Sequence, residues 1–471
     1  MTALTSNRFN RVAGLLLAHG FLVLTACAVA ADADSSDGWE LPENLKPTFE
    51  SLAADQQRFI SSGDFLDFIP ARQMEHEFTT REGEELSTML AEIMAAAEQM
   101  GYNPDRDMGA IPLNTDTVRF NELVIRPPLL RDENRDPGPF SVSRYIFPES
   151  GVPTFAGAKV AIWPEDLIVG DVDVAIVGVP NDMGSGRRGA NFGPQVMRAM
   201  NTLALPDVDS LLDPRRVLSI VDYGDFAIDP MSTELTVDHV TGMVAETAAT
   251  GAIPMLVGGD TSMLYPGVKG VAESRGRGEF GLVHFSAHPD TDREAVHSIS
   301  DEQALFMLLD ERIVSGQDVI TVGLRGPSVN VDTLQWLRGQ RVRYHTMAEI
   351  RRNGYGAVMA RVQEEVAKGP KKMFVSIDVS VIEPSQMVAA GRISPNGLSV
   401  QEVASAIRHL CAEKEIVGFE ITDMAPMLDF SRLSVVNANT VLNACLVGMA
   451  LRKAGFSADY VHPLAIDHGQ D

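Results

Sequence analysis

From about residue 170 onward, short runs of β-branched and apolar residues alternate with longer stretches in which apolar residues recur at helical spacing. Short runs of this kind predict buried strands, and the longer stretches predict helices that pack on them. The predicted strands cover residues 172–177, 217–221, 254–257, 281–285, 319–322, 373–377 and 416–421, and the predicted helices cover 236–250, 302–314, 356–368, 399–413 and 433–454. Because strands that alternate with helices need crossover connections, we expect an α/β fold, a three-layer α/β/α sandwich around a mostly parallel sheet.

Residues 1–30 have the pattern of an export signal. Arg8 and Arg11 precede an apolar stretch over residues 12–26, which an Ala-Val-Ala cleavage pattern follows. We therefore expect an exported protein, periplasmic or extracellular. Two alternatives stay open: a single transmembrane anchor, and a lipoprotein anchored through Cys27, because the residues before this cysteine resemble a bacterial lipobox.

Residues 31–150 are expected to form an N-terminal extension ahead of an α/β domain at 151–471. Residues 31–70 are acidic and lack a clean period, which is typical of a spacer. A helix is predicted at about 80–100, where apolar residues recur at helical spacing. Residues 103–150 are rich in Pro, Asp and Arg and are interpreted as an extended arm.

Composition and charge narrow the class of protein. Of the 471 residues, 45% are hydrophobic and 22% are charged, so we expect a packed core and exclude a disordered or collagen-like chain. The net charge of −25 opposes binding to phosphate backbones, and we expect no nucleic-acid partner. Cys411 and Cys445 fall in predicted helices as small buried hydrophobes, which could pair only if the fold brings them together.

Polar motifs follow the predicted strands, at the edge where parallel α/β sheets bind their ligands. These segments are residues 178–182 and 187–194 after the first strand, 258–262 (Gly-Gly-Asp-Thr-Ser) after the third, 284–290 (His-Phe-Ser-Ala-His-Pro-Asp) at the fourth, 376–384 (Ser-Ile-Asp-Val-Ser-Val-Ile-Glu-Pro) at the sixth, and 423–426 (Asp-Met-Ala-Pro) after the seventh. We expect them to meet in one site.

Taken together, these segments resemble the motifs of the ureohydrolase family, which includes arginase, agmatinase and guanidinobutyrase. The resemblance extends from about residue 151 onward, and Ser-Gly-Val-Pro-Thr-Phe at residues 150–155 is similar to the agmatinase branch in particular. It implies two Mn²⁺ ions at the strand ends, bridged by a hydroxide that attacks a small cationic guanidino compound and releases urea. Hard dications favour carboxylate and imidazole ligands and acidify bound water, so this implied chemistry is physically consistent.

When the family's six metal ligands are carried over residue by residue, three of the six are retained in this sequence. The implied ligands that persist are His288, Asp290 and Asp378, and hydroxyl residues stand at the other three positions, Thr261, Ser286 and Ser380. The two remaining carboxylates neutralise a single dication, and a neutral hydroxyl adds no charge. We therefore expect at most one divalent ion, Mn²⁺ or alternatively Ni²⁺ or Zn²⁺, with no metal at all as the other outcome.

Other positions that the resemblance implies are altered as well. Asp423 stands where the family has a Glu that holds the guanidinium group, and it is one methylene shorter. His297 falls near the family's proton-carrying loop histidine, with a solvated loop histidine as the alternative interpretation. Asp292 would add a carboxylate if its loop bends inward. Residues 388–391 (Val-Ala-Ala-Gly) replace a Pro-Gly-x-Gly-like stretch, so we expect a similar backbone path with a changed shape.

Packing alone accounts for some of these residues. We expect Asp260 to cap a short helix rather than to bind metal, and Glu383-Pro384 to form a turn. For His288, a buried histidine satisfied by hydrogen bonds stands beside the metal-ligand interpretation.

Two hypotheses about function follow. In the first, the chain is an active amidino hydrolase in which His288, Asp290 and Asp378 hold one metal ion and Asp423 binds the cationic amidine. In the second, the chain is a non-catalytic member of the family. It would then be a subunit of a homo- or hetero-oligomer with ureohydrolase-like chains, or a binding protein for a guanidino-like ligand.

Overall fold

The computed structural model describes residues 41–69, 71–107, 137–140, 153–185, 187, 189–200, 206–294 and 299–469. The predicted export signal with Cys27, most of the predicted arm, and His297 lie outside these ranges.

Within the described ranges, nine strands form one sheet in the order β1-β3-β2-β4-β9-β8-β5-β6-β7. The strands are β1 (Lys159–Val160), β2 (Val174–Gly178), β3 (Ile220–Asp225), β4 (Ile253–Val257), β5 (Gly281–Phe285), β6 (Val319–Leu324), β7 (Arg343–Thr346), β8 (Lys372–Asp378) and β9 (Glu415–Thr422). All neighbouring strands pair in parallel. The seven predicted strands are confirmed, and β1 and β7 add an edge strand on either side.

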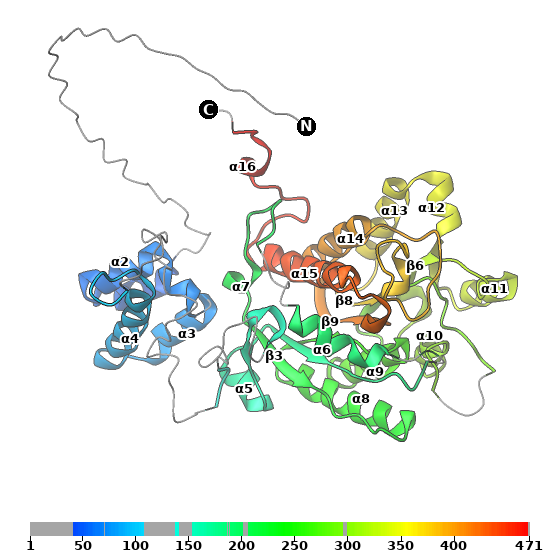
Figure 1. The fold of residues 1–471 in the computed structure, drawn as a ribbon, viewed down its shortest axis with the longest axis horizontal. Helices are drawn as coiled ribbons and strands as arrows, with labels where there is room; N and C mark the ends of the chain where they lie inside the picture. Colours follow the sequence, from blue (N-terminus) through cyan, green and yellow to red (C-terminus); the bar gives the residue numbers. More distant parts are fainter. Residues whose placement is uncertain are drawn as a thin grey trace, which may run out of the picture. The chain divides into compact units, whose positions relative to one another are not determined.

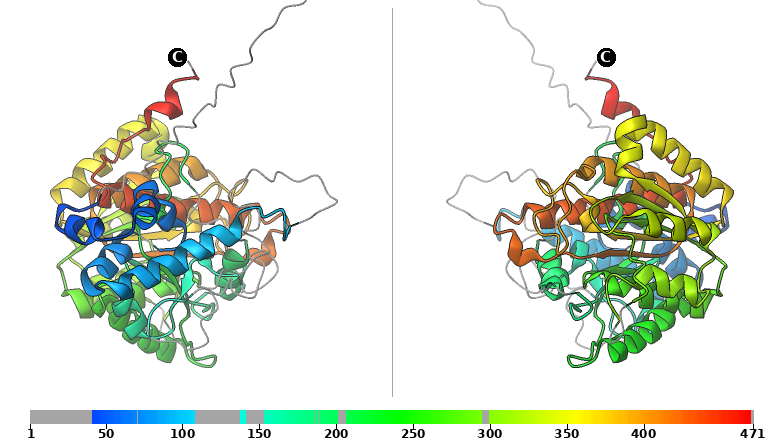
Figure 2. Two further views of the ribbon diagram at one scale, coloured as in Figure 1. Left: turned by 90° about the vertical axis from the view of Figure 1, so that its left-hand side faces the viewer. Right: turned by 90° about the vertical axis from the view of Figure 1, so that its right-hand side faces the viewer.

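Helices cover both faces of this sheet. Successive strand residues point to opposite sides, and because both sets of side chains are apolar, both faces must be covered. Met255 and Val257 of β4 join one hydrophobic cluster, and Leu256 between them joins the other. The first face carries α6 (Gly193–Ala199), α12 (Met347–Asn353), α13 (Tyr355–Lys368), α14 (Val400–Glu413) and α15 (Leu433–Lys453), and the second carries α8 (Thr233–Ala249), α9 (Leu264–Arg275), α10 (Ala304–Asp310) and α11 (Val331–Gly339). Figures 1 and 2 show α8 and α9 on the opposite side of the sheet from α13 and α14, which confirms the three-layer sandwich.

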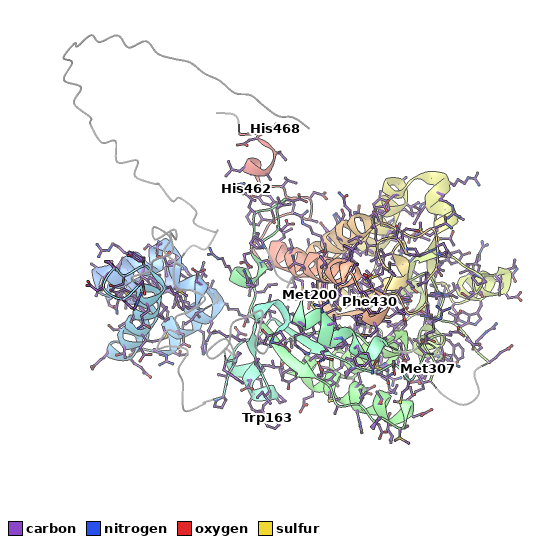
Figure 3. The ribbon with its side chains drawn as sticks, viewed as in Figure 1. Trp163, Met200, Met307, Phe430, His462 and His468 are labelled. Atoms are coloured by element: carbon purple, nitrogen blue, oxygen red, sulfur yellow. A yellow bond between two sulfur atoms is a disulfide. The ribbon has the colours of Figure 1, made fainter. Side chains whose placement is uncertain are left out.

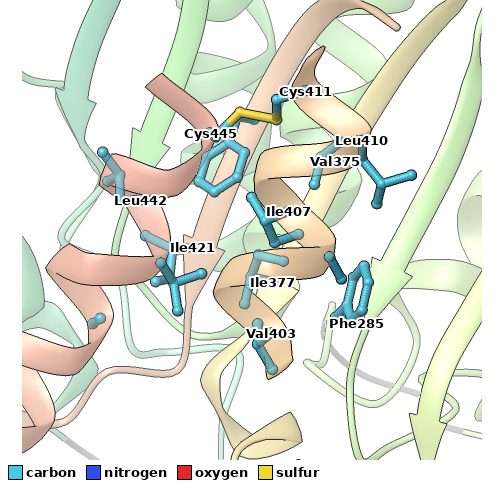
Figure 4. Packing of buried hydrophobic residues seen from close by; sticks show 14 of the residues in the cluster. Phe285, Val375, Ile377, Val403, Ile407, Leu410, Cys411, Ile421, Leu442 and Cys445 are labelled. Carbon is cyan, nitrogen blue, oxygen red and sulfur yellow. A yellow bond between two sulfur atoms is a disulfide. The ribbon is translucent and has the colours of Figure 1, made fainter. Parts of the chain in front are cut away.

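A disulfide joins Cys411 of α14 to Cys445 of α15, with their Cα atoms 5.3 Å apart (Figure 4). The sequence left this pairing open, and the fold makes it by packing α14 along α15. The 21-residue helix α15 is apolar enough to cross a membrane, but it is largely buried in the first cluster, as a core helix of a sandwich is.

The segment predicted as a spacer contains regular structure. It includes α1 (Lys46–Glu50) and α2 (Ala54–Ser62), which α3 (Ala71–Thr80) and the predicted helix α4 (Glu84–Met100) follow. Their apolar residues, such as Phe65 of the short turn after α2, form a hydrophobic cluster of their own. Each of α1 and α2 is too short to show a clear period, which explains why the pattern missed them. The remaining described helices are α5 (Pro164–Val169), α7 (Pro214–Val217) and α16 (Pro463–Ile466).

Candidate functional site

Four aspartates gather where the central strands end. Strands β4, β9, β8 and β5 are consecutive in the sheet, so their carboxyl ends share one edge. Asp260 follows β4, Asp423 follows β9, Asp378 ends β8, and Asp290 follows β5. Each of these residues is at most 1% exposed. The structure therefore brings the motif segments together in one buried, acidic centre.

Asp378 is held by several hydrogen-bond donors. Its Oδ2 accepts from the Ser286 hydroxyl at 2.9 Å, and its Oδ1 accepts from the Ser380 backbone N–H at 2.8 Å. His288 Nδ1 lies 3.5 Å from Asp378 Oδ2. Burial alone would raise the pKa of Asp378, but the hydrogen bond with His288 and the positive charge of Arg392 hold that pKa well below its usual range. Asp378 is therefore an anion that already has its partners.

The guanidinium of Arg392 lies among these carboxylates. Arg392 Nη1 donates to Asp290 Oδ1 at 3.0 Å, and Nη2 donates to Asp378 Oδ2 at 3.2 Å. Only 10% of the Arg392 side chain is exposed. Burial favours the neutral form, but the negative charges of Asp290 and Asp378 outweigh it and keep the pKa of Arg392 well above its ordinary value. A permanent cation thus binds the two carboxylates that the sequence analysis assigned to a metal.

Asp301 supplies a third carboxylate that sequence reasoning did not identify. Its Oδ2 lies 3.2 Å from Arg392 Nε, an ion pair without the alignment of a hydrogen bond. The Asp301 backbone N–H donates to the Gly184 carbonyl at 2.9 Å, which fixes this loop beside the first motif. Burial raises the pKa of Asp301, and the charge of Arg392 opposes that rise. Each guanidinium nitrogen of Arg392 therefore faces a different aspartate.

Asp423 binds the loop that carries Arg392. Its Oδ2 accepts from the Arg392 backbone N–H at 2.8 Å, and its carbonyl accepts from the Gly391 N–H at 2.9 Å. Burial and the negative charge of Asp378 raise the pKa of Asp423 well above its ordinary value. The carboxylate predicted to hold a substrate guanidinium is thus turned to backbone of its own chain.

The loop carrying Arg392 is fixed on both sides. A Cβ added at Gly391 would lie 2.4 Å from Asp423 Oδ1, so this close approach needs glycine. On the other side, Arg325 donates to the carbonyls of Ser380 at 2.6 Å and Ser394 at 2.7 Å. Burial lowers the pKa of Arg325 to about 10. The altered stretch before Arg392 therefore has a defined path, and the expected turn at Glu383-Pro384 is present ahead of it, at residues 384–386.

Asp260 caps a short helix, as expected. It is the N-cap of the helical turn Thr261–Met263, and its Oδ1 accepts from the backbone N–H and the hydroxyl of Ser262. Burial raises the pKa of Asp260 to about 7. The Thr261 hydroxyl lies 3.4 Å from that of Thr422.

A buried polar chain supports Asp290 from within the sheet. His284 Nε2 lies 3.1 Å from Asp290 Oδ2, and His284 Nδ1 lies 2.9 Å from the Ser376 hydroxyl. Ser376 in turn donates to Glu420 Oε1. These three residues belong to the strands β5, β8 and β9 and orient Asp290 from behind.

The donor set does not fit a divalent ion. In the part of the chain that the structure describes, no group of three or more His, Cys, Asp or Glu side chains is placed to hold a metal. His288 has partners for both ring nitrogens, with Nδ1 at 3.2 Å from the Ser380 hydroxyl and Nε2 at 3.3 Å from that of Ser394. Asp292 accepts the Glu294 N–H in its own loop. A dication here would also meet the Arg392 cation at close range.

Arg392, Asp301 and His284 are the residues that sequence reasoning missed. One signal was present for Arg392: it is the single basic residue between Lys372 and Arg408, and it directly follows the altered stretch. No comparable signal marked Asp301, because it belongs to none of the segments that follow the predicted strands.

The comparisons with known proteins place this architecture in a family. The chain is 28% identical over 285 residues to proclavaminate amidinohydrolase of Streptomyces clavuligerus, and this match covers 59% of this chain and 88% of that protein. The solved structure of that enzyme matches with a TM-score of 0.58 and 25% identity, and it covers 64% of this chain and 99% of the other. It is also 28% identical over 280 residues to mitochondrial agmatinase of Gallus gallus, covering 59% and 81% of the two chains. The fold is shared with Trypanosoma cruzi formiminoglutamase with Mn²⁺, at a TM-score of 0.54 and 23% identity over 60% and 95% of the two chains. The family model described as the arginase family matches residues 172–448, more than half of the sequence, and the chain therefore belongs to the arginase family.

Proposed function

We propose that this chain is a non-catalytic member of the arginase family, which keeps the fold of the hydrolases without their metal-dependent chemistry. The observation that carries the proposal is that Arg392 donates hydrogen bonds to both Asp290 and Asp378. These are the two carboxylates that the family resemblance retains as metal ligands. Part of their negative charge is already offset by a cation of the chain itself.

Electrostatics favours Arg392 over a metal ion in this centre. A dication would have to displace the Arg392 guanidinium from a buried cluster or meet that cation at close range. The positions Thr261, Ser286 and Ser380 offer hydroxyls, which bring no compensating charge. A dication therefore finds its position taken by Arg392 and only neutral hydroxyls at three of the six ligand positions.

The chemical groups for hydrolysis also have other partners. The Ser286 hydroxyl donates to Asp378, and the Ser380 hydroxyl faces His288. Asp423, the candidate for binding a guanidino substrate, accepts a backbone N–H. Among the described residues of this centre, the hydroxyls and the carboxylate that could serve hydrolysis already have partners within the chain, which favours a structural or binding role.

The role that we propose is that of a subunit in an assembly with ureohydrolase-like chains, either copies of itself or catalytic relatives. Support comes from a segment after β9 that presents apolar side chains to solvent, among them Phe430 at 92% exposure (Figure 3). Met427, Leu428 and Leu433 of the same segment are also at least half exposed. Clustered exposed apolar side chains of this kind mark interaction sites. The multi-angle light scattering mass of the purified protein, alone and mixed with a catalytic relative, tests this role.

The test of the proposed function is a metal and activity analysis of the purified protein. The protein is incubated with Mn²⁺, Ni²⁺ or Zn²⁺, desalted and analysed for bound metal, and urea release is measured with a panel of guanidino compounds. A catalytic agmatinase treated in parallel is the positive control. We expect no stoichiometric metal and no urea. One metal ion per chain together with urea release would establish the alternative, a hydrolase with one ion on His288, Asp290 and Asp378.

We also propose that the protein is exported, as its first residues predict. The Cys411–Cys445 disulfide supports this, because disulfides persist in oxidising compartments. Cell fractionation with mass spectrometry of the mature N-terminus would test export and distinguish a cleaved signal from a lipid on Cys27.

A further inference from the structure

The aspartates around Arg392 match the shape of one guanidinium group. Nη1 lies 3.0 Å from Asp290, Nη2 lies 3.2 Å from Asp378, and Nε lies 3.2 Å from Asp301. The three carboxylates come from separate segments, after β5, at the end of β8 and in the loop before α10, and their side chains are at most 5% exposed. Two of the three guanidinium nitrogens thus donate hydrogen bonds, and the third is ion-paired, so each nitrogen faces its own carboxylate.

We infer that this aspartate cradle, defined by Asp290, Asp301 and Asp378, is a binding site for a guanidinium or amidinium cation, and that Arg392 fills it as an internal ligand. The inference rests on the proposed function and names the ligand chemistry of the same site. In the native protein the cradle is closed to free cations because its own arginine occupies it. Without that side chain, the cradle accepts a small free guanidinium.

The cradle does not depend on the Arg392 side chain for its framework. Asp378 is fixed by Ser286 and by the Ser380 N–H, and Asp290 is fixed by His284. The loop itself is held through backbone, since Asp423 accepts the N–H groups of its residues and Arg325 donates to its carbonyls. Truncating the side chain at residue 392 therefore leaves Asp290 and Asp378 in place, and the loop of Asp301 stays fixed by its backbone hydrogen bond to Gly184.

Charge gives this space its selectivity. Three buried carboxylates that lose their cation repel one another, and any cation that restores the balance stabilises the folded state. A guanidinium can bond three carboxylates at once, whereas an ammonium or a tetraalkylammonium cannot reproduce the planar fork. Guanidinium and methylguanidinium present three planar nitrogens to the cradle, whereas acetamidinium presents two and should bind more weakly.

The experiment is chemical rescue of the Arg392→Ala variant, followed by thermal unfolding. We expect the variant to melt below the native protein and to regain at least about half of the lost Tm in ~10 mM guanidinium chloride, far below denaturing concentrations. Equal concentrations of sodium or tetramethylammonium chloride should restore nothing. The native protein and Arg351→Ala, which truncates an exposed arginine on α12, should be insensitive to guanidinium. Arg392→Lys keeps the charge without the fork and should gain less than the alanine variant.

Three outcomes of the rescue experiment would overturn the inference. Folded Arg392→Ala protein without a guanidinium-dependent rise in Tm shows that the cradle does not bind the cation, while the proposed function stands if the native protein still lacks metal and activity. Rescue by Mn²⁺ in place of guanidinium would make the cradle a metal site. If the alanine variant does not fold, the double variant Arg392→Ala/Asp301→Asn removes one unpaired charge, and absence of rescue there equally contradicts the inference. Urea release by the native protein would refute the proposed function instead.

Discussion

Ser376 donates a hydrogen bond from its hydroxyl to Glu420 Oε1 over 2.6 Å, and both side chains are buried in the interior of the sheet. Glu420 is 0% exposed. Burial raises its pKa to about 8, and the charges of Asp378 and Asp290 add to the rise. The folded protein therefore holds a proton on Glu420 that the unfolded chain releases near its ordinary pKa.

Glu420→Gln is expected to remove a pH dependence of stability. A raised carboxyl pKa gives stability that is present below the unfolded pKa and is lost as the pH rises through the folded value. The loss should amount to about 1.4 kcal/mol per pH unit between about pH 5 and pH 8. Urea unfolding of both proteins across this range measures it. The unfolding free energy of the glutamine variant should increase relative to that of the native protein as the pH rises. Glu364→Gln, at an exposed position of α13, should show no such change.

Asp378→Asn should destabilise the protein at neutral pH, and this destabilisation should become smaller at low pH. The change leaves Arg392 with one hydrogen-bonded carboxylate fewer, and the loss of this charged hydrogen bond is expected to cost about 1.5–3 kcal/mol at neutral pH. Because the pKa of Asp378 is depressed, its contribution exists above the unfolded pKa and disappears as the pH falls through the folded value. The difference from the native protein should therefore shrink in acid. Asp310→Asn, at an exposed position of α10, is the matched control, and an equal loss there would contradict the interpretation.

Gly391→Ala should destabilise the centre by crowding Asp423. The new Cβ would lie 2.4 Å from Asp423 Oδ1, and overpacking of this kind costs about 1–3 kcal/mol. The same substitution at Gly356, in α13, meets no atom within 4 Å and should stabilise the helix by up to about 1 kcal/mol. Thermal unfolding of both variants checks the opposite signs, and a shift of the same sign in both would show that space at Gly391 is not limiting.

The Cys411–Cys445 disulfide should contribute strongly to stability. It closes a loop between residues 34 apart, for which chain entropy predicts about 4 kcal/mol. Unfolding of the native protein with and without a reductant present in the denaturant measures the contribution. Thiol titration of the unreduced, denatured protein should find both cysteines blocked, and two reactive thiols would disprove the bond.

The arrangement of the fold was accessible from the sequence because buried parallel strands are continuous apolar runs. The edge strand β7 escaped detection because Arg343, Tyr344 and His345 carry polar atoms, and β1 is only two residues long. The motif residues after each strand were also identified, since the sheet topology places strand ends together. Arg392 was not, because the destination of a long side chain on a loop is set by contacts such as those of Asp423 and Arg325, which no local pattern contains.

The Arg392 contacts also constrain which amino-acid substitutions this centre tolerates. Restoring carboxylates at Ser286 and Ser380 while Arg392 remains would crowd new anions around one cation, and removing Arg392 first would leave the present anions bare. Each of these single substitutions therefore gives a less stable protein. Under the proposed function, we expect metal binding to require coordinated replacement of both the arginine and the hydroxyl residues.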